Sequence, residues 1–343
     1  MTLRGSQART SGQAALRIGT RASTLARTQS GMVADLITER TGRAVELVSI
    51  TTEGDVTSGP LAALGGTGVF VSALRDALLA GEVDLAVHSL KDLPTGPAEG
   101  IALAAVPTRE DPRDVVVARD GLTLGELPPG SRVGTGSPRR VAQLEALGLG
   151  IELVGVRGNV DTRIGKVRSG ELDAVVLARA GIARLGRLEE VTEVLDPIQV
   201  LPAPGQGALA VECRASDTEL VALIAGALDD AHSRAAVECE RMVLAELEAG
   251  CSAPVGALAD VVEGEDGPDS PPELWIRAVA SSLDGALAVR LSASGPYDDP
   301  IGLGRKLAAE MIAEGAHELL DQPDPAPLTS AADSTSEDHA SGK

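Results

Sequence analysis

The chain has 343 residues, 43% of them hydrophobic and 23% charged, so it is long enough for two or three domains that each bury a core. Its formal net charge of −20 argues against nucleic acid or an anionic membrane as the main partner, because both bind basic surfaces. Phe70, Trp275 and Tyr297 are the only Phe, Trp and Tyr residues, which leaves no platform for stacking bases.

The three cysteines, Cys213, Cys239 and Cys251, show neither a CxxC pair nor a Cys/His spacing. This pattern predicts no disulfide framework and no metal site, as is usual in a reducing cytoplasm. The first residues lack the apolar core of a signal peptide, and no run approaches the roughly 18 apolar residues of a membrane span. We therefore expect a cytoplasmic protein without metal, membrane or nucleic-acid partners, with disordered tails at residues 1–14 and 322–343.

The first part of the chain alternates strand and helix patterns, which predicts a mainly parallel sheet with helices on both faces. The expected strands are residues 15–19, 45–50, 84–88 and 101–106, and the expected helices are residues 25–40 and 70–80. A polar, glycine-rich loop is expected at residues 51–68. A late strand at residues 209–213 could return to this sheet, so that the chain crosses between two domains twice.

The strand and helix alternation restarts at Asp114, which predicts a second α/β domain. Its expected strands are residues 114–118, 132–135, 151–156 and 173–177, and its expected helices are residues 138–147 and 160–169. The pattern changes at about residue 230, where a small α+β domain with a three-stranded sheet is expected. Its helices are expected at residues 230–249 and 299–320, and its strands at residues 255–262, 274–280 and 286–291.

The expected fold class is therefore α/β, with two doubly wound domains and a small α+β domain at the C-terminal end. The domain boundaries follow from the crossings: residues 15–108 with 206–227 form the first domain, 109–205 the second and 228–321 the third.

The strand at residues 84–88 delivers polar groups at its carboxyl end, where His88, Ser89, Lys91 and Asp92 follow before Pro94 ends the segment. Open α/β sheets build their sites just outside such strand ends. A carboxylate there can protonate a leaving group or stabilise a developing cation. The alternative is a solvated turn, with Lys91 and Asp92 as a surface ion pair and His88 as a hydrogen-bonded structural residue.

The second domain is basic within an acidic protein. Residues 132–187 contain ten Arg and Lys residues and five Asp and Glu residues, a net charge of 10 − 5 = +5. Ser137 and Asn159 stand where helices begin, with arginines beside them. Because helix N-termini and arginine forks both attract anions, the pattern predicts clamps for a ligand with several carboxylates or phosphates. The alternative, surface arginine, suits Arg168 and Arg187 best.

Seven motifs together resemble the hydroxymethylbilane synthase family, also called porphobilinogen deaminase, from about residue 16 to residue 320. The motifs are Gly19-Thr-Arg-Ala-Ser23, Ala86-Val-His-Ser-Leu-Lys-Asp-Leu-Pro94, Arg109-Glu-Asp-Pro-Arg-Asp114, Val133-Gly-Thr-Gly-Ser-Pro-Arg-Arg140, Arg157-Gly-Asn-Val-Asp-Thr-Arg163, Leu201-Pro-Ala-Pro-Gly-Gln-Gly207 and Gly250-Cys-Ser-Ala-Pro-Val-Gly256. Each is weak alone, but their order and spacing make the set specific.

The resemblance implies a monomeric transferase whose first two domains are similar to periplasmic binding proteins. Such enzymes join four porphobilinogen units head to tail with release of ammonia, and then hydrolyse off the linear tetrapyrrole hydroxymethylbilane. Their primer is a dipyrromethane cofactor, made from the substrate and held by a thioether to a cysteine in the third domain. A growing, tethered product needs room, so we expect hinges near residues 107–113 and 201–207.

The resemblance also assigns roles residue by residue. Cys251, in its glycine- and proline-rich turn, matches the tether, and Asp92 matches the catalytic carboxylate. Cofactor-binding positions match Ser89, Lys91, Asp92, Ser137, Arg139, Arg140, Arg157, Gly158, Arg163 and Arg184, while substrate-binding positions match Arg21, Ser23, Phe70, Arg157, Arg163 and Gln206. The loop at residues 59–69 departs from many relatives, because Ala63 and Thr67 stand where lysines are frequent.

Two other function classes fit part of the pattern. A non-catalytic binding protein for a polycarboxylate solute would also use two α/β domains around an arginine-lined cleft. It has no use for a cysteine loop in a third domain, and the sequence shows no secretion signal. The effector half of a transcription regulator is the other class, but neither end of the chain carries a basic DNA-reading helix.

Overall fold

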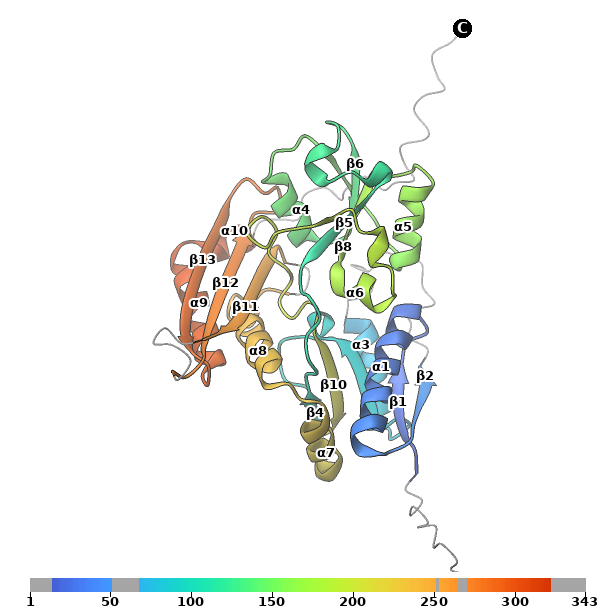
Figure 1. The fold of residues 1–343 in the computed structure, drawn as a ribbon. Helices are drawn as coiled ribbons and strands as arrows, with labels where there is room; N and C mark the ends of the chain where they lie inside the picture. The colour runs from blue at the N-terminus through green and yellow to red at the C-terminus, as the bar shows by residue number, and fades with distance from the viewer. Residues whose placement is uncertain (1–13, 51–67, 251–252, 264–269, 322–343) are drawn as a thin grey trace, which may run out of the picture.

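The computed structural model describes residues 14–50, 68–250, 253–263 and 270–321. These residues form two five-stranded sheets and one three-stranded sheet, each with its own helices, which we call units one, two and three (Figure 1). The expected disordered tails lie outside the described residues except for Ala14, and the expected loop at 51–68 lies outside them except for Gly68.

Unit one is a five-stranded sheet in the order β2-β1-β3-β10-β4. Its elements are β1 (Leu16–Thr20), α1 (Thr24–Thr41), β2 (Val45–Ser49), α3 (Gly68–Leu79), β3 (Leu85–Ser89), β4 (Ile101–Ala105), β10 (Leu209–Arg214) and α7 (Thr218–Leu228). β1 pairs parallel with β2 and β3, whereas β10 runs antiparallel between β3 and β4. The predicted return of residues 209–213 to the first sheet is therefore confirmed.

Unit two repeats this order as β7-β6-β8-β5-β9, with β5 in the place of β10. Its elements are β5 (Asp114–Ala118), β6 (Arg132–Thr135), α4 (Pro138–Glu145), β7 (Glu152–Gly155), α5 (Val160–Arg168), β8 (Ala174–Ala178), α6 (Arg179–Arg184) and β9 (Glu193–Val194). Alternate residues of a strand point to opposite faces, so Val115 and Val117 pack toward α5 and α6, while Val116 packs toward α4. The sheet is covered on both faces, as predicted.

Unit three is an antiparallel sheet in the order β11-β12-β13, with its helices on one face. Its elements are α8 (Ala231–Glu246), β11 (Val255–Val262), β12 (Glu273–Ser281), β13 (Ala288–Pro296), α9 (Pro300–Ala313) and α10 (Ala316–Leu320). The single helix expected at residues 299–320 is wrong: Gly315, with a φ of +92°, separates α9 from α10. Glycine adopts this left-handed backbone without the strain that a side chain brings.

Other differences from the sequence-based elements are local. Neither α6 nor α7 was expected, because α6 has six residues and α7 is apolar around most of its circumference, so neither shows a helical stripe. Short 3₁₀ turns also form at η2 (Leu90–Asp92), η3 (Arg119–Gly121), η4 (Leu124–Glu126) and η5 (Leu188–Glu190).

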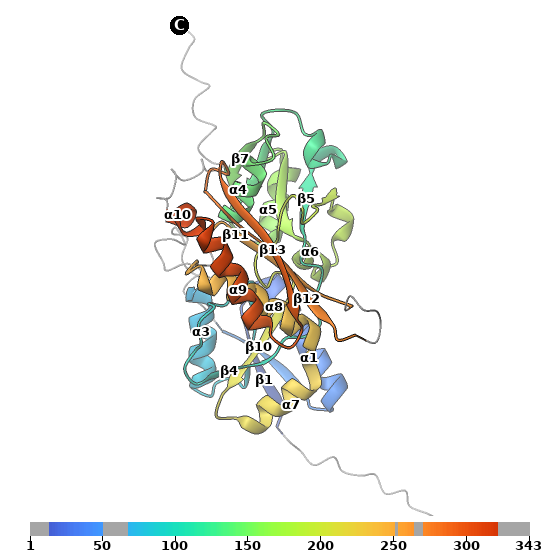
Figure 2. The ribbon, with the colours of Figure 1, turned by 90° about the vertical axis from the view of Figure 1, so that its left-hand side faces the viewer.

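Two crossing segments join units one and two, the first at residues 107–113 and the second at residues 201–207. They run side by side, with the Glu110 amide donating to the Gly207 carbonyl over 3.3 Å. Unit three lies against both other units (Figure 2). The predicted class, two doubly wound α/β units and a small α+β unit, is confirmed. No helix in the described ranges has the length and apolar character needed to cross a membrane.

Candidate active site

The carboxyl end of β3 leads directly into the η2 turn, which carries Lys91 and Asp92. Leu90 is fully buried and anchors the turn. Arg241 of α8 holds its far side by donating to the carbonyls of Leu93, over 2.9 Å, and Pro94, over 2.6 Å. Asp92 is half-buried, and its carboxylate accepts no hydrogen bond from any other described residue. On a fixed backbone, the turn thus presents a carboxylate that receives no hydrogen bond from the described part of the chain.

Lys91 points from η2 toward the second crossing segment, where its Nζ donates to Oε1 of Gln206 over 3.2 Å. The pKa of Lys91 is lowered to about 8, chiefly by burial; Arg140 and Arg139 also lower it, while Asp92 and Asp114 act to raise it. The Lys91 amine is therefore surrounded by two arginines, Arg139 and Arg140, and by two carboxylates, those of Asp92 and Asp114. Gln206 is buried and donates to the Pro112 carbonyl over 2.6 Å, so it links Lys91 to both crossing segments.

His88, the other candidate acid or base at this strand end, is buried in unit one. Its Nε2 lies 3.3 Å from Oε2 of Glu212, which also accepts two hydrogen bonds from Arg75. Burial acts to raise the pKa of Glu212, but His88 and Arg75 outweigh it and hold this pKa at about 2. This arrangement favours the structural interpretation of His88.

The start of α4 follows the end of β6, as expected, with Ser137 at the N-cap and Pro138 in the first turn. The Ser137 side chain does not make the expected capping bond. Arg139 and Arg140 are buried, and both donate to Asp114, the first residue of β5, over 2.7 Å each. These two arginines are therefore partly committed to a carboxylate of the chain itself.

The start of α5 follows the end of β7 and carries three further predicted residues. Asn159 caps this helix by accepting from the Thr162 amide over 2.8 Å. Arg157 and Gly158 are exposed, while Arg163 is half-buried and donates through Nε to the Gly158 carbonyl over 2.9 Å. Burial and the nearby Arg140 lower the pKa of Arg163 to about 10. No carboxylate contributes to that shift, so Arg163 is a half-buried cation beside another cation.

Four further predicted residues lie before and at the start of α1, at the end of β3 and on α6, and none of them lines the pocket described below. Ser23 caps α1 by accepting from the Ala26 amide over 3.3 Å, and Arg21 precedes it, half-buried. Ser89 accepts from Nε2 of Gln29 over 3.1 Å. Arg184, on α6, donates to the Gly207 carbonyl over 2.5 Å, and burial lowers its pKa.

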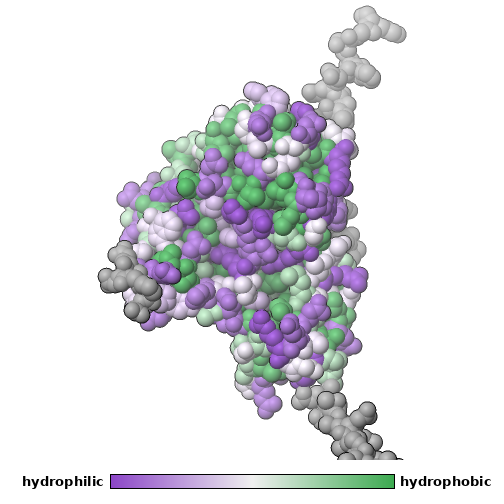
Figure 3. Space-filling view, in the orientation of Figure 1, coloured by the Kyte–Doolittle hydropathy of each residue, from purple (hydrophilic) through white to green (hydrophobic). Residues whose placement is uncertain are grey.

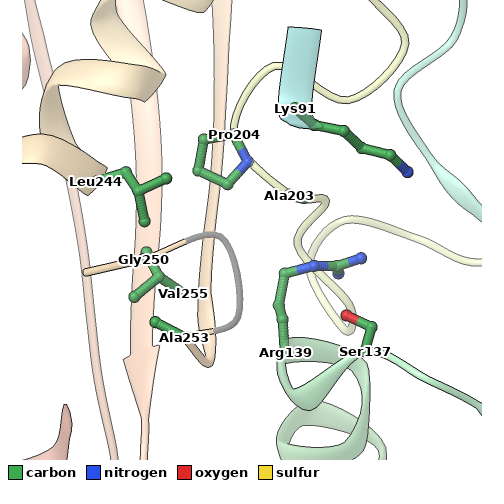
Figure 4. Close-up of a pocket in the computed structure, with 9 residues that line it drawn as sticks. All are labelled: Lys91, Ser137, Arg139, Ala203, Pro204, Leu244, Gly250, Ala253 and Val255. Carbon is green, nitrogen blue, oxygen red and sulfur yellow. The ribbon is translucent and has the colours of Figure 1, made fainter. Parts of the chain in front are cut away.

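A pocket lies where the three units meet (Figure 4). Lys91 from η2 and Arg139 from α4 approach it from opposite sides, and unit three closes a further side. Its lining residues are Lys91, Ser137, Arg139, Ala203, Pro204, Leu244, Gly250, Ala253 and Val255. Figure 3 shows hydrophilic side chains gathered across the middle of the molecule, at the level of α6 and the crossing segments. The structure thus brings residues from distant motifs to one place.

Two predicted residues cannot be placed in the pocket directly. Cys251 lies outside the described residues, although Gly250 and Ala253, the nearest described residues on either side, both line the pocket. Phe70 lies in the first turn of α3, but its side chain is outside the described part, as is the loop with Ala63 and Thr67.

The other cysteines are poor nucleophiles. Cys213 and Cys239 are buried, and burial raises the pKa of each thiol to about 12. A thiol must ionise to attack, so neither competes for thioether chemistry near neutral pH.

The charge around the pocket suits a ligand with several carboxylates. Lys91, Arg139, Arg140 and Arg163 bring four positive charges, against two negative charges from Asp92 and Asp114, a balance of 4 − 2 = +2. The buried Nε atoms of Arg139, Arg140 and Arg184 have no hydrogen-bond acceptor among the described residues. A dipyrromethane, with two carboxylates on each pyrrole, supplies acceptors of the kind these residues bind.

Two family models match the chain. Residues 16–222 match the model described as porphobilinogen deaminase, dipyromethane cofactor binding domain, and residues 234–313 match the porphobilinogen deaminase C-terminal domain. Porphobilinogen deaminase 1 of Streptomyces coelicolor is 60% identical over 316 residues, which cover 90% of this chain and 98% of that protein. Porphobilinogen deaminase of Mycobacterium avium is 59% identical over 307 residues, covering 89% and 96%.

Solved structures of binding proteins are also similar. The methionine-binding protein MetQ covers 62% of this chain and 89% of its own, with a TM-score of 0.39 and 12% identity.

Proposed function

The chain belongs to the porphobilinogen deaminase family, and from that membership we propose roles for the residues that meet at its pocket. The family's enzymes are transferases of tetrapyrrole biosynthesis that join four porphobilinogen molecules into hydroxymethylbilane on a dipyrromethane cofactor. Identity of 59–60% to such enzymes over most of the chain does not favour the solute-binding alternative.

Asp92 is the proposed catalytic residue. In each addition the C–N bond of the porphobilinogen aminomethyl group breaks, and its electron pair leaves with ammonia. A C–C bond forms between that methylene carbon and a free pyrrole carbon, which loses a proton. A carboxylate beside the reacting pyrroles can hold this proton and stabilise the positive pyrrole nitrogen. Asp92 suits the role because its carboxylate is half-buried and accepts no hydrogen bond from the other described residues.

The cations around Asp92 are proposed to hold acetate and propionate groups. Arg139 and Arg140 lie within electrostatic reach of Lys91, and Arg140 also lies within reach of Arg163, whose pKa no described carboxylate raises. Arginine suits this work because its guanidinium stays charged and its fork grips a carboxylate through two bonds. We assign further contacts to substrate or cofactor to Arg21, Ser23, Ser89, Arg157, Gly158, Arg184 and the buried Gln206, and retain Phe70 on the resemblance alone.

Cys251 is the proposed tether. When bound, the dipyrromethane group supplies the terminal pyrrole carbon to which new units are joined. The observation that carries the proposal is the pocket itself, because Gly250 and Ala253, the nearest described residues before and after Cys251, line it together with Lys91 and Arg139. A tether at this place keeps the growing chain beside Asp92 between additions, so each addition is effectively unimolecular.

The test is the intact mass of the purified chain beside that of a Cys251→Ser variant. We expect the unmutated chain to exceed its sequence mass by two pyrrole units and the variant to match its sequence.

An Asp92→Asn variant should keep the added mass if supplied with preformed cofactor, yet turn over about 10²- to 10⁴-fold more slowly. Asp76→Asn, at an exposed carboxylate of α3, should behave as unmutated protein. An unmutated chain that gains no mass with porphobilinogen would contradict the assignment.

The enzyme is further proposed to act as a cytoplasmic monomer without metal. The cysteine pattern is that of a reducing compartment, and none of the three cysteines has a metal-ligand spacing. Sedimentation at the mass of one chain, and turnover that EDTA does not lower, are the expected results.

A further inference from the structure

Asp114 is a buried carboxylate whose contacts join the pocket residues of unit two to Lys91, the pocket residue of unit one. It is the first residue of β5, directly after the first crossing segment, and it has no exposed surface. Oδ2 accepts from Nη2 of Arg139 over 2.7 Å, and Oδ1 accepts from Nη2 of Arg140 over 2.7 Å. Oδ1 also accepts from Nε2 of Gln206 over 2.8 Å. Three donors from two separate segments thus converge on one side chain.

The contacts continue into unit one through Gln206. Its amide nitrogen donates to Asp114, while its amide oxygen accepts from Nζ of Lys91 over 3.2 Å. The order of contacts is therefore Arg139 and Arg140, Asp114, Gln206, and Lys91, which adjoins Asp92. Each member restricts the orientation of the next, because a carboxylate or amide with several partners has few ways to satisfy them all.

The negative charge of Asp114 compensates part of the positive charge of the two buried arginines that it contacts. Two buried arginines side by side, without a carboxylate, would repel each other and stay desolvated without compensation. A single carboxylate offsets one of these two charges and leaves the other for a ligand. Burial opposes ionisation of Asp114, but Arg139 and Arg140 outweigh it and hold its pKa well below its usual value. The carboxylate is therefore ionised near neutral pH.

Asp114 also determines which N–H groups of Arg139 and Arg140 remain available to bind a ligand. Each arginine gives one Nη to Asp114, and the other binds a backbone carbonyl, Leu201 for Arg139 and Val176 for Arg140. With both Nη groups held, each guanidinium plane is set. The pocket side of Arg139 then faces Ser137 and Lys91 (Figure 4).

We propose that Asp114 is a positioning residue for the polymerisation, which orients Arg139 and Arg140 and, through Gln206, Lys91 toward the carboxylates of the growing pyrrole chain. The inference rests on the proposed function of this pocket. Asp114 touches neither substrate nor cofactor in this role. Its effect is on binding geometry, so its loss should raise the KM for porphobilinogen more than it lowers kcat.

The experiment compares Asp114→Asn with Asp173→Asn, both measured per folded, cofactor-loaded molecule. Asp173 is a suitable control because it is also an arginine-bonded carboxylate of unit two, paired with Arg119 and the Arg132 amide. None of its hydrogen bonds within the described chain involves a residue that lines the pocket. We expect Asp114→Asn to raise KM at least about tenfold with kcat within about threefold, and Asp173→Asn to leave both unchanged.

A pH profile separates positioning from a purely structural role. Removing the Asp114 charge takes away one of the groups that favour the charged form of Lys91, while Arg139, Arg140 and Asp92 remain. The alkaline limb of kcat/KM should therefore move to lower pH in Asp114→Asn. A residue that only stabilised the fold would lower the yield of folded protein and leave both the limb and KM in place.

A second variant covers the case in which Asp114→Asn does not fold. Gln206→Met breaks the link to Lys91 while Asp114 keeps both arginines, and it should also shift the alkaline limb to lower pH and raise KM. Unchanged KM and limb in a folded Asp114→Asn, or in Gln206→Met where the first does not fold, would overturn the inference. If the unmutated chain neither carries two pyrrole units nor consumes porphobilinogen, the proposed function itself fails instead.

Discussion

Lys91 and Asp92 are adjacent in the chain but differ in how they are held. The amine of Lys91 is tied to Gln206 and surrounded by four charged groups, whereas the carboxylate of Asp92 accepts nothing from the described residues. This difference suits the proposed roles, in which Lys91 binds carboxylate groups of the ligand and the neighbouring Asp92 takes part in the reaction. A residue that must exchange a proton gains from being uncommitted, while one that orients a ligand gains from being fixed.

Turnover should fall as the pH rises through about 8, because Lys91 loses its charge there. In Lys91→Arg the guanidinium stays charged, so the alkaline limb of kcat/KM should move above about pH 10, although the longer fork lowers turnover near pH 7. Because its pKa is lowered, charged Lys91 costs the folded state free energy below about pH 8, and this cost disappears as the pH rises from 8 toward 10.5. Titration of Lys91 therefore does not unfold the protein in this pH range, and unfolding does not explain the loss of turnover. If the unmutated chain and Lys91→Arg showed the same alkaline limb, this limb would arise from the titration of a group other than Lys91.

At the scale of elements, the crossing segments and strand ends were foreseeable from the sequence to different degrees. The end of β3 was predicted from an apolar run followed by polar residues and Pro94, and the starts of α4 and α5 from Ser137 and Asn159. Local patterns carry that information. Which carboxylate pairs with the buried arginines was not predictable, since Asp114 reaches Arg139 only once β5 enters the sheet beside β8.

The second crossing segment depends on Gly207, whose φ is +90°. A Cβ at this position would lie 2.3 Å from the carbonyl oxygen of Glu110 in the first crossing segment. Gly207→Ala should therefore both strain the backbone, by about 1–3 kcal/mol, and force the two segments apart. Because the Gly207 carbonyl accepts from Arg184, turnover should fall as well.

Gly42→Ala is the matched control for this prediction. Gly42 also has a positive φ, +70°, but an added Cβ would meet no heavy atom of the described residues within 4 Å apart from its chain neighbours, so only the backbone strain remains. Denaturant unfolding of the two variants should show a larger loss of unfolding free energy for Gly207→Ala, with turnover lowered in that variant alone. Equal losses and normal turnover would show that the crossing segments tolerate separation.

At the scale of the molecule, one buried side chain of unit three holds both crossing segments. Glu240 of α8 has no exposed surface and accepts from Nη1 and Nη2 of Arg109, in the first crossing segment, over 2.7 and 3.0 Å. It also accepts from the Gly205 amide of the second crossing segment over 2.7 Å and from the Ala259 amide of β11 over 2.9 Å. Glu240 thus connects unit three to the two crossing segments, where we predict the hinges between units one and two. No local pattern predicts a contact between residues 131 positions apart.

Glu240→Ala should therefore destabilise the whole molecule and uncouple unit three. It leaves the Arg109 guanidinium and two amides buried without their acceptor, a loss of about 3–5 kcal/mol. Glu246→Ala, on the same helix, removes only an exposed ion pair with Arg305 and should cost less than about 1 kcal/mol.

Trp275, the only tryptophan, lies in β12 and reports on unit three alone, whereas far-ultraviolet circular dichroism reports on every unit. In the unmutated chain and in Glu246→Ala the two signals should change together in denaturant, and in Glu240→Ala the tryptophan signal should change first. Coincident transitions in all three proteins, with equal stability losses in the two variants, would mean that unit three is held by its apolar contacts rather than by Glu240.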